Sequence, residues 1–286
     1  MKHGSNRLAG ISWMVVTGLL FVAVTCIVRH LGSDLPAVQA AFIRYAVGLL
    51  LIIPLAWKIR LRLPSRRIWK LYVARGACHG IAVILWFFSM ARIPIADVTA
   101  IGYLAPVFTT VGAVLFLKEE FRIHRVIAVI VGVLGAVIIL RPGFEVIEIG
   151  AIAQLIACPL FAASFLLAKR LTDSEHATDI LVMLSLFCTL VLLPGAVYNW
   201  RTPTLTEFGW LALTAVFASL GHYTLTRAFA VAPISLTQPI SFLQLVWATL
   251  LGIWLFAEPV DFWLLVGGGL IVAAVTYMSR KEMDSN

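Results

Sequence analysis

The chain has 286 residues, of which 61% are hydrophobic and only 13% are charged, with a mean hydropathy of +0.98. A soluble domain carries about 25% charged residues, so this composition excludes a water-facing surface over most of the chain. The formal net charge is +8. Because so few charges accompany so much apolar surface, this basic balance indicates a lipid partner before a nucleic acid.

Ten apolar stretches follow one another along the chain, each of about the 20 residues that a membrane-spanning helix needs. In lipid the backbone must satisfy its own hydrogen bonds, and strands of a membrane barrel would show alternating polarity instead. We therefore predict an all-α integral membrane protein with ten transmembrane helices. The predicted spans are residues 9–29, 36–57, 69–91, 95–117, 123–140, 148–170, 178–199, 206–229, 234–256 and 260–279.

The first apolar run has the outline of a signal peptide, because a basic segment precedes it. However, the run from Ala9 to Val28 is about as long as a full span, and no A-x-A cleavage site follows it. We expect it to be the first transmembrane helix. The four cysteines lie in apolar stretches without a C-x-x-C pair, so we expect small core residues rather than disulfides or a zinc site.

The basic residues are distributed unevenly between the two sides of these predicted helices. With the N-terminus in the cytoplasm, all but five of the 22 Lys and Arg residues fall on the cytoplasmic side. The other five are Arg29, Arg44, Arg92, Arg141 and Arg201. The positive-inside rule then predicts that both termini are cytoplasmic. The basic cluster at 58–75 is an orientation signal on this interpretation, and a headgroup or nucleic-acid patch is the alternative.

The two halves of the chain resemble each other. Residues 91–119 align without gaps on residues 230–258, with eight identical positions. The identities include helix-end residues that apolar composition does not explain, namely Pro94 with Pro233 and Glu119 with Glu258. Each half holds five predicted helices, so the second half enters the membrane from the opposite side. This inverted repeat, residues 1–146 and 147–286, is typical of secondary transporters that work by alternating access.

These features resemble the drug/metabolite transporter superfamily and, within it, the EamA family. An A-x-x-P-I segment precedes both the fourth and the ninth predicted helices, and the helix-ending acids in F-L-K-E-E and F-A-E-P match the family pattern in both halves. The third and fourth helices are most similar to YddG-like bacterial amino-acid exporters. The resemblance implies a multi-pass inner-membrane exporter of amino acids, including aromatic or apolar ones. It also implies a central cavity lined by helices three, four, eight and nine and gated by helices one and six.

Polar residues inside apolar helices usually face a cavity or another helix, because hydrocarbon disfavours them. His79 and His222 lie on related faces of symmetry-related predicted helices, and the alternative for each is a structural bond to a backbone carbonyl. The predicted substrate-binding residues are His79, Trp86, Tyr103, Ser164, His222, Tyr223, Phe242 and Gln244. The predicted gating or hinge residues are Pro106, Pro159 and Pro239, since proline interrupts helical hydrogen bonding, although each also fits a packing kink.

No Asp or Glu lies in the middle of a predicted span. This absence disfavours carboxylate-driven proton antiport and sodium coupling, and it leaves facilitated diffusion or proton transfer by a histidine. We expect Glu119 and Glu258 to cap the helices that follow them, where the helix dipole favours negative charge. Gly76 and Gly80 form a G-x-x-x-G that predicts close helix packing.

The chain carries none of the motifs of an intramembrane enzyme, such as H-E-x-x-H, G-x-S-x-G or paired aspartates in the membrane. We therefore expect a transporter rather than an enzyme, with no cofactor and no metal, as a monomer or homodimer. Its expected partners are a small-molecule substrate and the lipid bilayer, without nucleic acid. The alternatives are an exporter of other small metabolites or cationic drugs, a nucleotide-sugar exchanger, a membrane scaffold or receptor and, more remotely, an intramembrane enzyme.

Overall fold

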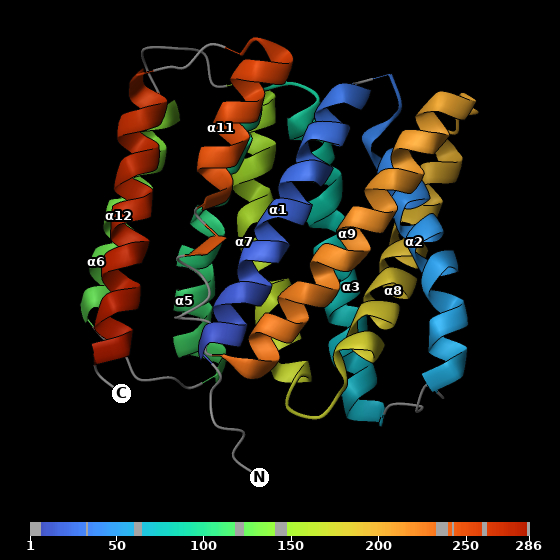
Figure 1. The fold of residues 1–286 in the computed structure, drawn as a ribbon, viewed down its shortest axis with the longest axis horizontal. Coiled ribbons are helices and arrows are strands. Elements are labelled where there is room, and N and C mark those ends of the chain that lie inside the picture. The colour runs from blue at the N-terminus through green and yellow to red at the C-terminus, as the bar shows by residue number, and fades with distance from the viewer. Residues whose placement is uncertain are drawn as a thin grey trace.

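The computed structural model describes residues 7–32, 34–59, 65–117, 123–140, 148–232, 240–241, 243–258 and 262–284. In these ranges the chain is built from α-helices, and the bundle they form is shown in Figure 1. The helices are α1 (Arg7–Leu31), α2 (Ala37–Ile59), α3 (Arg66–Met90), α4 (Ile95–Gly102), α5 (Leu104–Leu117), α6 (Ile123–Leu140), α7 (Ile149–Leu171), α8 (Ala177–Tyr198), α9 (Leu205–Val231), α11 (Leu243–Phe256) and α12 (Phe262–Asp284).

Within the ranges that the structure describes, six helices are long and apolar enough to cross a membrane, by length and composition. These segments are Leu8–Leu31, Ala37–Pro54, Arg66–Met90, Ile149–Leu171, Ala177–Tyr198 and Leu205–Val231. They coincide with the first, second, third, sixth, seventh and eighth predicted spans. The complete set of ten spans and the cytoplasmic position of the termini stay predictions, although the start of α1 and the end of α12 lie at the same end of the bundle (Figure 1).

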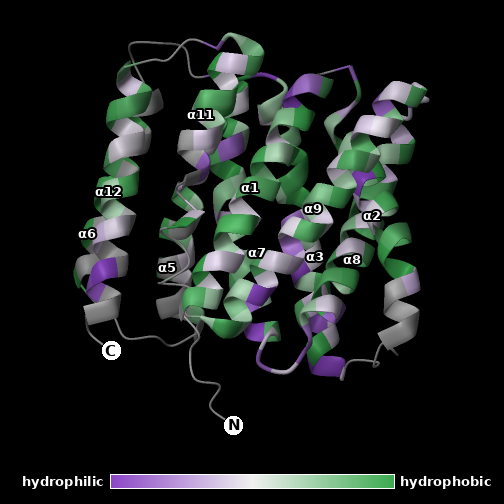
Figure 2. Cartoon of the chain, viewed as in Figure 1, coloured by the Kyte–Doolittle hydropathy of each residue, from purple (hydrophilic) through white to green (hydrophobic). Residues whose placement is uncertain are grey.

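Apolar residues dominate the helices of the bundle, as the green segments of the ribbon in Figure 2 show, and many of them are exposed on its outside. Large side chains such as Leu50, Phe116, Ile123, Leu205 and Trp254 are 67–89% exposed. Water disfavours so much exposed apolar surface, whereas hydrocarbon chains do not. The surface therefore fits a lipid environment.

The helices pack in pairs that join the two halves of the chain. α1 packs against α9, α3 against α7, α2 against α8 and α6 against α12. In the predicted repeat, α1 corresponds to α7, α2 to α8, α3 to α9 and α6 to α12. Exchange of the two halves therefore converts the α1–α9 pair into the α3–α7 pair, and it leaves the α2–α8 and α6–α12 pairs unchanged. The packing is thus the arrangement expected of two related halves.

Glycines let several of these helices approach closely. A Cβ on Gly76 would overlap Phe187 of α8, and a Cβ on Gly80 would lie 3.2 Å from Val191 Cγ1. The predicted close packing at the G-x-x-x-G of α3 is therefore present, against α8. Gly221 of α9 makes a similar approach to α1, since a Cβ there would lie 2.7 Å from the ring of Phe21.

The fourth predicted span is interrupted at Tyr103. α4 ends at Gly102, and α5 begins at Leu104. Pro106 lies in the first turn of α5, and it has no N–H with which to continue the hydrogen bonding of α4. Proline thus acts here as a helix interruption rather than as a kink within one continuous span.

A buried carboxylate joins three elements at one end of the bundle. Glu258, which follows α11, accepts hydrogen bonds from the backbone N–H of Ile95 at 3.0 and 3.3 Å, and it pairs with Nε of Arg29 at 3.0 Å. Arg29, near the end of α1, also donates to the carbonyls of Met90 and Ile93. Glu258 therefore caps the first turn of α4, a partner that the sequence did not predict. Residues 259–261 lie outside the described residues, so the expected cap of the helix that follows Glu258 in sequence stays a prediction. Glu119 lies outside the described residues.

Candidate functional site

A cavity of about 220 Å³ lies among the central helices. Its walls come mainly from α1, α3, α4, α7 and α9, with single residues from α2, α5 and α11. At ~30 Å³ per water molecule, the volume corresponds to about seven waters. The cavity is therefore of a size for a small molecule.

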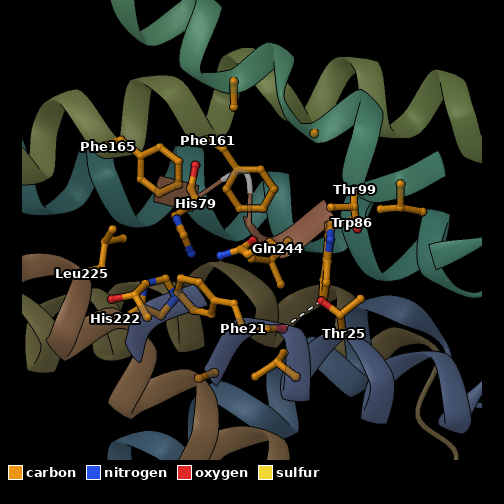
Figure 3. A pocket seen from close by; sticks show the side chains of 18 of the residues that line it. Phe21, Thr25, His79, Trp86, Thr99, Phe161, Phe165, His222, Leu225 and Gln244 are labelled. Carbon is orange, nitrogen blue, oxygen red and sulfur yellow. Dashed lines mark hydrogen bonds between the residues drawn. The ribbon is translucent and has the colours of Figure 1, made fainter. Parts of the chain in front are cut away.

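Two histidines from different halves of the chain meet in this cavity. The ring of His79 on α3 lies edge-to-face with the ring of His222 on α9, with the centroids 4.9 Å apart. Both side chains are buried, with exposed fractions of 2% and 6%. The structure thus brings together the two histidines that the sequence placed on related helix faces, as Figure 3 shows.

The two imidazoles differ in their hydrogen bonding. Nδ1 of His79 lies 2.9 Å from Oγ of Ser164 on α7, where either atom can donate according to the histidine tautomer. Nδ1 of His222 is buried and has no hydrogen-bond partner among the described residues. Ser164 itself is fully buried and lies behind the cavity wall, so it orients His79. A buried ring nitrogen that no described protein group satisfies calls for an explanation, and a bound ligand or water can supply its partner.

Aromatic rings surround the histidine pair. Phe161 of α7 lies 5.3 Å from the His79 ring, and Phe21 of α1 lies 5.2 Å from the His222 ring, both edge-on. Phe161 also stacks on Phe165, with 6.2 Å between centroids. The cavity therefore offers an apolar, aromatic wall beside its polar groups, which is the usual composition of a small-molecule site.

Two glutamines add amide groups to the lining. Gln244 of α11 packs against Gly18 of α1, and Figure 3 shows its side chain directed toward the histidines. Gln154 of α7 is 2% exposed, and its Oε1 has no hydrogen-bond partner in the described part of the chain. Glutamine amides can both donate and accept, so these side chains can orient a polar ligand.

Trp86 and Tyr103 also line the cavity. In Figure 3 Trp86 lies with Thr99 toward one end of the cavity, away from Leu225 at the other. Tyr103 is buried at the break between α4 and α5, and its hydroxyl donates to the carbonyl of Ser241 at 3.1 Å. The tyrosine thus links the interrupted span to the segment before α11.

The remaining predicted residues lie elsewhere or cannot be placed. Tyr223 packs against the cluster of Ile52, Leu181 and Val182 and accepts a hydrogen bond from Arg227 at 3.3 Å, outside the cavity lining. Phe242 and Pro239 lie outside the described residues.

The two placed prolines have different surroundings. Pro159 lies within the unbroken helix α7, and its side chain is exposed on the outer face. Pro106 lies in the first turn of α5, directly after the break at Tyr103. Of these two proline positions, only the one at Pro106 coincides with an interrupted helix.

The sequence reasoning missed one charged residue of the lining. Arg44 of α2 is only 6% exposed, and its guanidinium carbon lies 3.8 Å from the ring centroid of Tyr45. The positive-inside count uses Arg44 and Arg75 as markers of the two membrane faces, and the structure shows that both side chains are buried among helices. The signal was present, because Arg44 lies well inside the predicted span 36–57, and an ionisable residue at such a position is rare without a function.

A bundle of apolar helices around a small-molecule cavity defines a polytopic membrane protein of the transporter type. The chain belongs to the EamA-like transporter family, which matches residues 8–141 and again residues 148–280. The resemblance predicted from the sequence is thereby confirmed at the level of the family. The protein is a multi-pass protein of the bacterial inner membrane.

Curated relatives cover nearly the whole chain. A riboflavin transporter of Vibrio cholerae is 28% identical over 99% of this chain and 96% of its own length. A pseudopaline exporter of Pseudomonas aeruginosa is 29% identical over 96% of this chain and 97% of its own. An S-adenosylmethionine uptake transporter of Rickettsia bellii is 26% identical over 96% of both chains. All three are transporters, but their substrates and directions differ.

A solved structure supports the fold. The crystal structure of a protein that is 16% identical to this chain superimposes with a TM-score of 0.67 over 96% of this chain and 98% of its own. At this identity the likeness concerns the fold alone.

Proposed function

We propose that the protein is a secondary transporter that exports amino acids, including aromatic or apolar ones, by alternating access around the central cavity. The observation that carries this proposal is the cavity itself, where His79 and His222 meet beside the aromatic rings of Phe21 and Phe161. Polar groups suit the charged ends of an amino acid, and the rings suit an apolar side chain.

The proposed mechanism rests on the pairing of helices across the two halves. Each half of the proposed repeat, residues 1–146 and 147–286, contributes one histidine, and α1 and α7 supply the phenylalanines on either side of the pair. Two related halves of opposite orientation can exchange conformations, and this exchange moves the cavity opening from one face to the other. The α1–α9 and α3–α7 pairs support this proposal, because they exchange with each other under the repeat.

Reconstitution into liposomes tests the proposal. Purified protein should move labelled phenylalanine, tryptophan and leucine across the bilayer, whereas protein-free vesicles should not. Addition of a proton ionophore separates the two coupling schemes, because facilitated diffusion keeps its initial rate and histidine-mediated proton exchange does not. Failure with every amino acid of a broad panel, beside success with another metabolite, would reject the amino-acid substrate.

Riboflavin is the second candidate substrate. The relative from Vibrio cholerae is a riboflavin transporter, and the aromatic wall formed by Phe21, Phe161 and Phe165 offers faces and edges for a flat ring system. The same liposomes should therefore be tested with riboflavin. Uptake of riboflavin without uptake of any amino acid would favour this candidate over the first.

A further inference from the structure

The cavity wall contains a charged group that the proposed function leaves unexplained. Arg44 of α2 lines the cavity, although only 6% of its surface is exposed. Its guanidinium lies over the ring of the adjacent Tyr45. This contact holds the face of the guanidinium, but it uses none of the five N–H donors at its edge.

No negative charge balances this guanidinium within the described ranges of the chain. Nε of Arg44 is buried without a hydrogen-bond partner, and Glu207 and Glu258, which form ion pairs in these ranges, do so with Arg201 and Arg29. None of the residues that line the cavity is an Asp or a Glu. The segment 233–239, which leads toward α11, contains no acid either.

An unpaired charge in a buried position is costly, because the protein neither solvates it as water does nor neutralises it with a counter-ion. Guanidinium is a planar donor group that matches the two oxygens of a carboxylate or phosphate. His79 and His222 line the same cavity as Arg44, so further nitrogen groups surround a ligand bound there. The lining thus combines an unused donor set with an excess of positive charge.

We propose that Arg44 is the anion-binding residue of the cavity and that the transported molecule carries an oxyanion, namely a carboxylate or a phosphate. This proposal rests on the proposed transport function and narrows its substrate class. An amino acid satisfies it through its carboxylate. A cationic drug without an acidic group does not, because its charge would add to that of Arg44 in a lining that holds no acid.

Binding to the purified, detergent-solubilised protein tests this proposal separately from transport. The probes form a matched series on one phenyl ring: phenylalanine, phenylalanine methyl ester, 3-phenylpropionate and phenyl phosphate. Quenching of tryptophan fluorescence, to which Trp86 in the cavity wall contributes, reports binding. We expect the acid to bind at least about tenfold more tightly than its ester, because the ester cannot accept a bidentate charge-assisted bond.

The variants assign this preference to one residue. Arg44→Gln should reduce the preference for acid over ester to less than about twofold, and Arg44→Lys should keep part of it as a point charge. Arg92→Gln is the matched control, because Arg92 also lies over an aromatic ring, that of Phe88, but is exposed. It should keep the full preference.

The outcomes separate the two proposals. A wild-type protein that binds ester as tightly as acid, or an Arg44→Gln protein that keeps the tenfold preference, overturns the role of Arg44 even if amino acids are transported. Binding of phenylpropionate or phenyl phosphate, lost in Arg44→Gln, supports the role of Arg44 even if no amino acid is transported. If Arg44→Gln does not fold, the role of Arg44 is tested by the preference for acid over ester in the wild type and in Arg44→Lys. A preference that is absent in the wild type, or undiminished in Arg44→Lys, overturns the proposal.

Discussion

His79 and His222 lie in opposite halves of the chain, yet their rings meet edge-to-face with centroids 4.9 Å apart. The contact joins α3 to α9, and Phe161 and Phe21 enclose it from α7 and α1. A substrate between these helices therefore touches both halves at once. In the proposed alternating-access mechanism, movement of one half relative to the other would change this contact directly, so the pair would couple binding to the conformational change.

His79→Ala should lower the transport efficiency by about tenfold, the effect of losing about 1.4 kcal/mol of binding. The measurement is the initial rate of uptake into liposomes as a function of substrate concentration. His176→Ala is the matched control, because His176 is exposed at the start of α8 and makes no side-chain cap there. Unchanged transport by a folded His79→Ala protein would return His79 to a structural role.

Ser164→Ala should reduce transport by about two- to tenfold, since the hydroxyl is the partner of Nδ1 of His79 at 2.9 Å. Because Ser164 is fully buried behind the histidine, we expect it to act through His79. A double-mutant cycle checks this, as the loss in the double variant should equal that in His79→Ala alone. Additive losses would instead indicate an independent role for the serine.

Glu258→Gln should loosen one end of the bundle, because it removes the ion pair with Arg29 while the amide oxygen can still accept from Ile95. Loss of this ion pair should cost about 1–2 kcal/mol of stability at this end of the bundle. That cost corresponds to roughly a tenfold increase in the population of a state in which the end of α1 separates from Glu258. Maleimide labelling of Cys26, which is half-buried about one turn before Arg29, should rise.

Two controls accompany the labelling experiment. Cys78 is also half-buried, but it lies on α3 about three turns before Met90, the residue of α3 that Arg29 contacts. Its labelling in the same protein should therefore not change. Glu207→Gln removes another acid–arginine pair, that with Arg201, in an exposed position, and it should leave Cys26 unaltered. Equal labelling of Cys26 in the wild type and in Glu258→Gln would contradict the proposed opening.

Gly76→Ala should destabilise the protein by about 1–3 kcal/mol, because the new Cβ would overlap Phe187 Cβ and lie 3.2 Å from the Phe187 carbonyl carbon. The thermal unfolding temperature in detergent measures the effect. Gly209→Ala is the control, since a Cβ at Gly209 meets no atom within 4 Å. Similar unfolding temperatures for the two variants would show that α3 and α8 can separate without cost.

Ala257→Gly should stabilise the protein by up to about 1 kcal/mol. Ala257 ends α11 with a φ of +51°, a left-handed conformation that costs an L-residue free energy and that glycine adopts readily. The N–H groups of Ala257 and Glu258 donate to the carbonyls of Ile253 and Gly252, so this is a true helix-ending motif. Ala273→Gly, at an exposed position within α12, should instead lower the unfolding temperature.

The sequence predicted that the two histidines lie on related faces, because the repeat pairs His222 with Val83 and His79 lies one helical turn from Val83. Periodicity also explains why Tyr223 does not share the cavity with His222. Consecutive residues on a helix point about 100° apart, so two neighbours rarely face the same small site. His79 and Trp86 are two turns apart on one helix, so their spacing predicts that they share a face. Both residues line the cavity, as this spacing predicts.

Charge was harder to interpret from the sequence. Counting basic residues treats each one as a marker of a membrane face, and Arg44 and Arg75 show that a buried arginine can be miscounted in this way. Glu258 shows the same limitation, because its partner Ile95 belongs to a distant segment of the chain. Hydropathy and spacing report on neighbours along one helix, whereas these contacts depend on how distant helices pack.

The break between α4 and α5 has a consequence for how the site responds to mutation. Thr99, Gly102 and Tyr103 line the cavity where α4 ends. The last turn of a helix has carbonyl groups without the usual i+4 partner, and of those in α4 the carbonyl of Ala100 accepts from the Tyr103 N–H and that of Ile101 from Sγ of Cys158. Main-chain oxygens of this kind survive every side-chain replacement. A substitution scan of the cavity side chains would therefore leave any contribution of the α4 peptide groups to recognition unmeasured, and such a contribution would show as residual binding in multiply substituted variants.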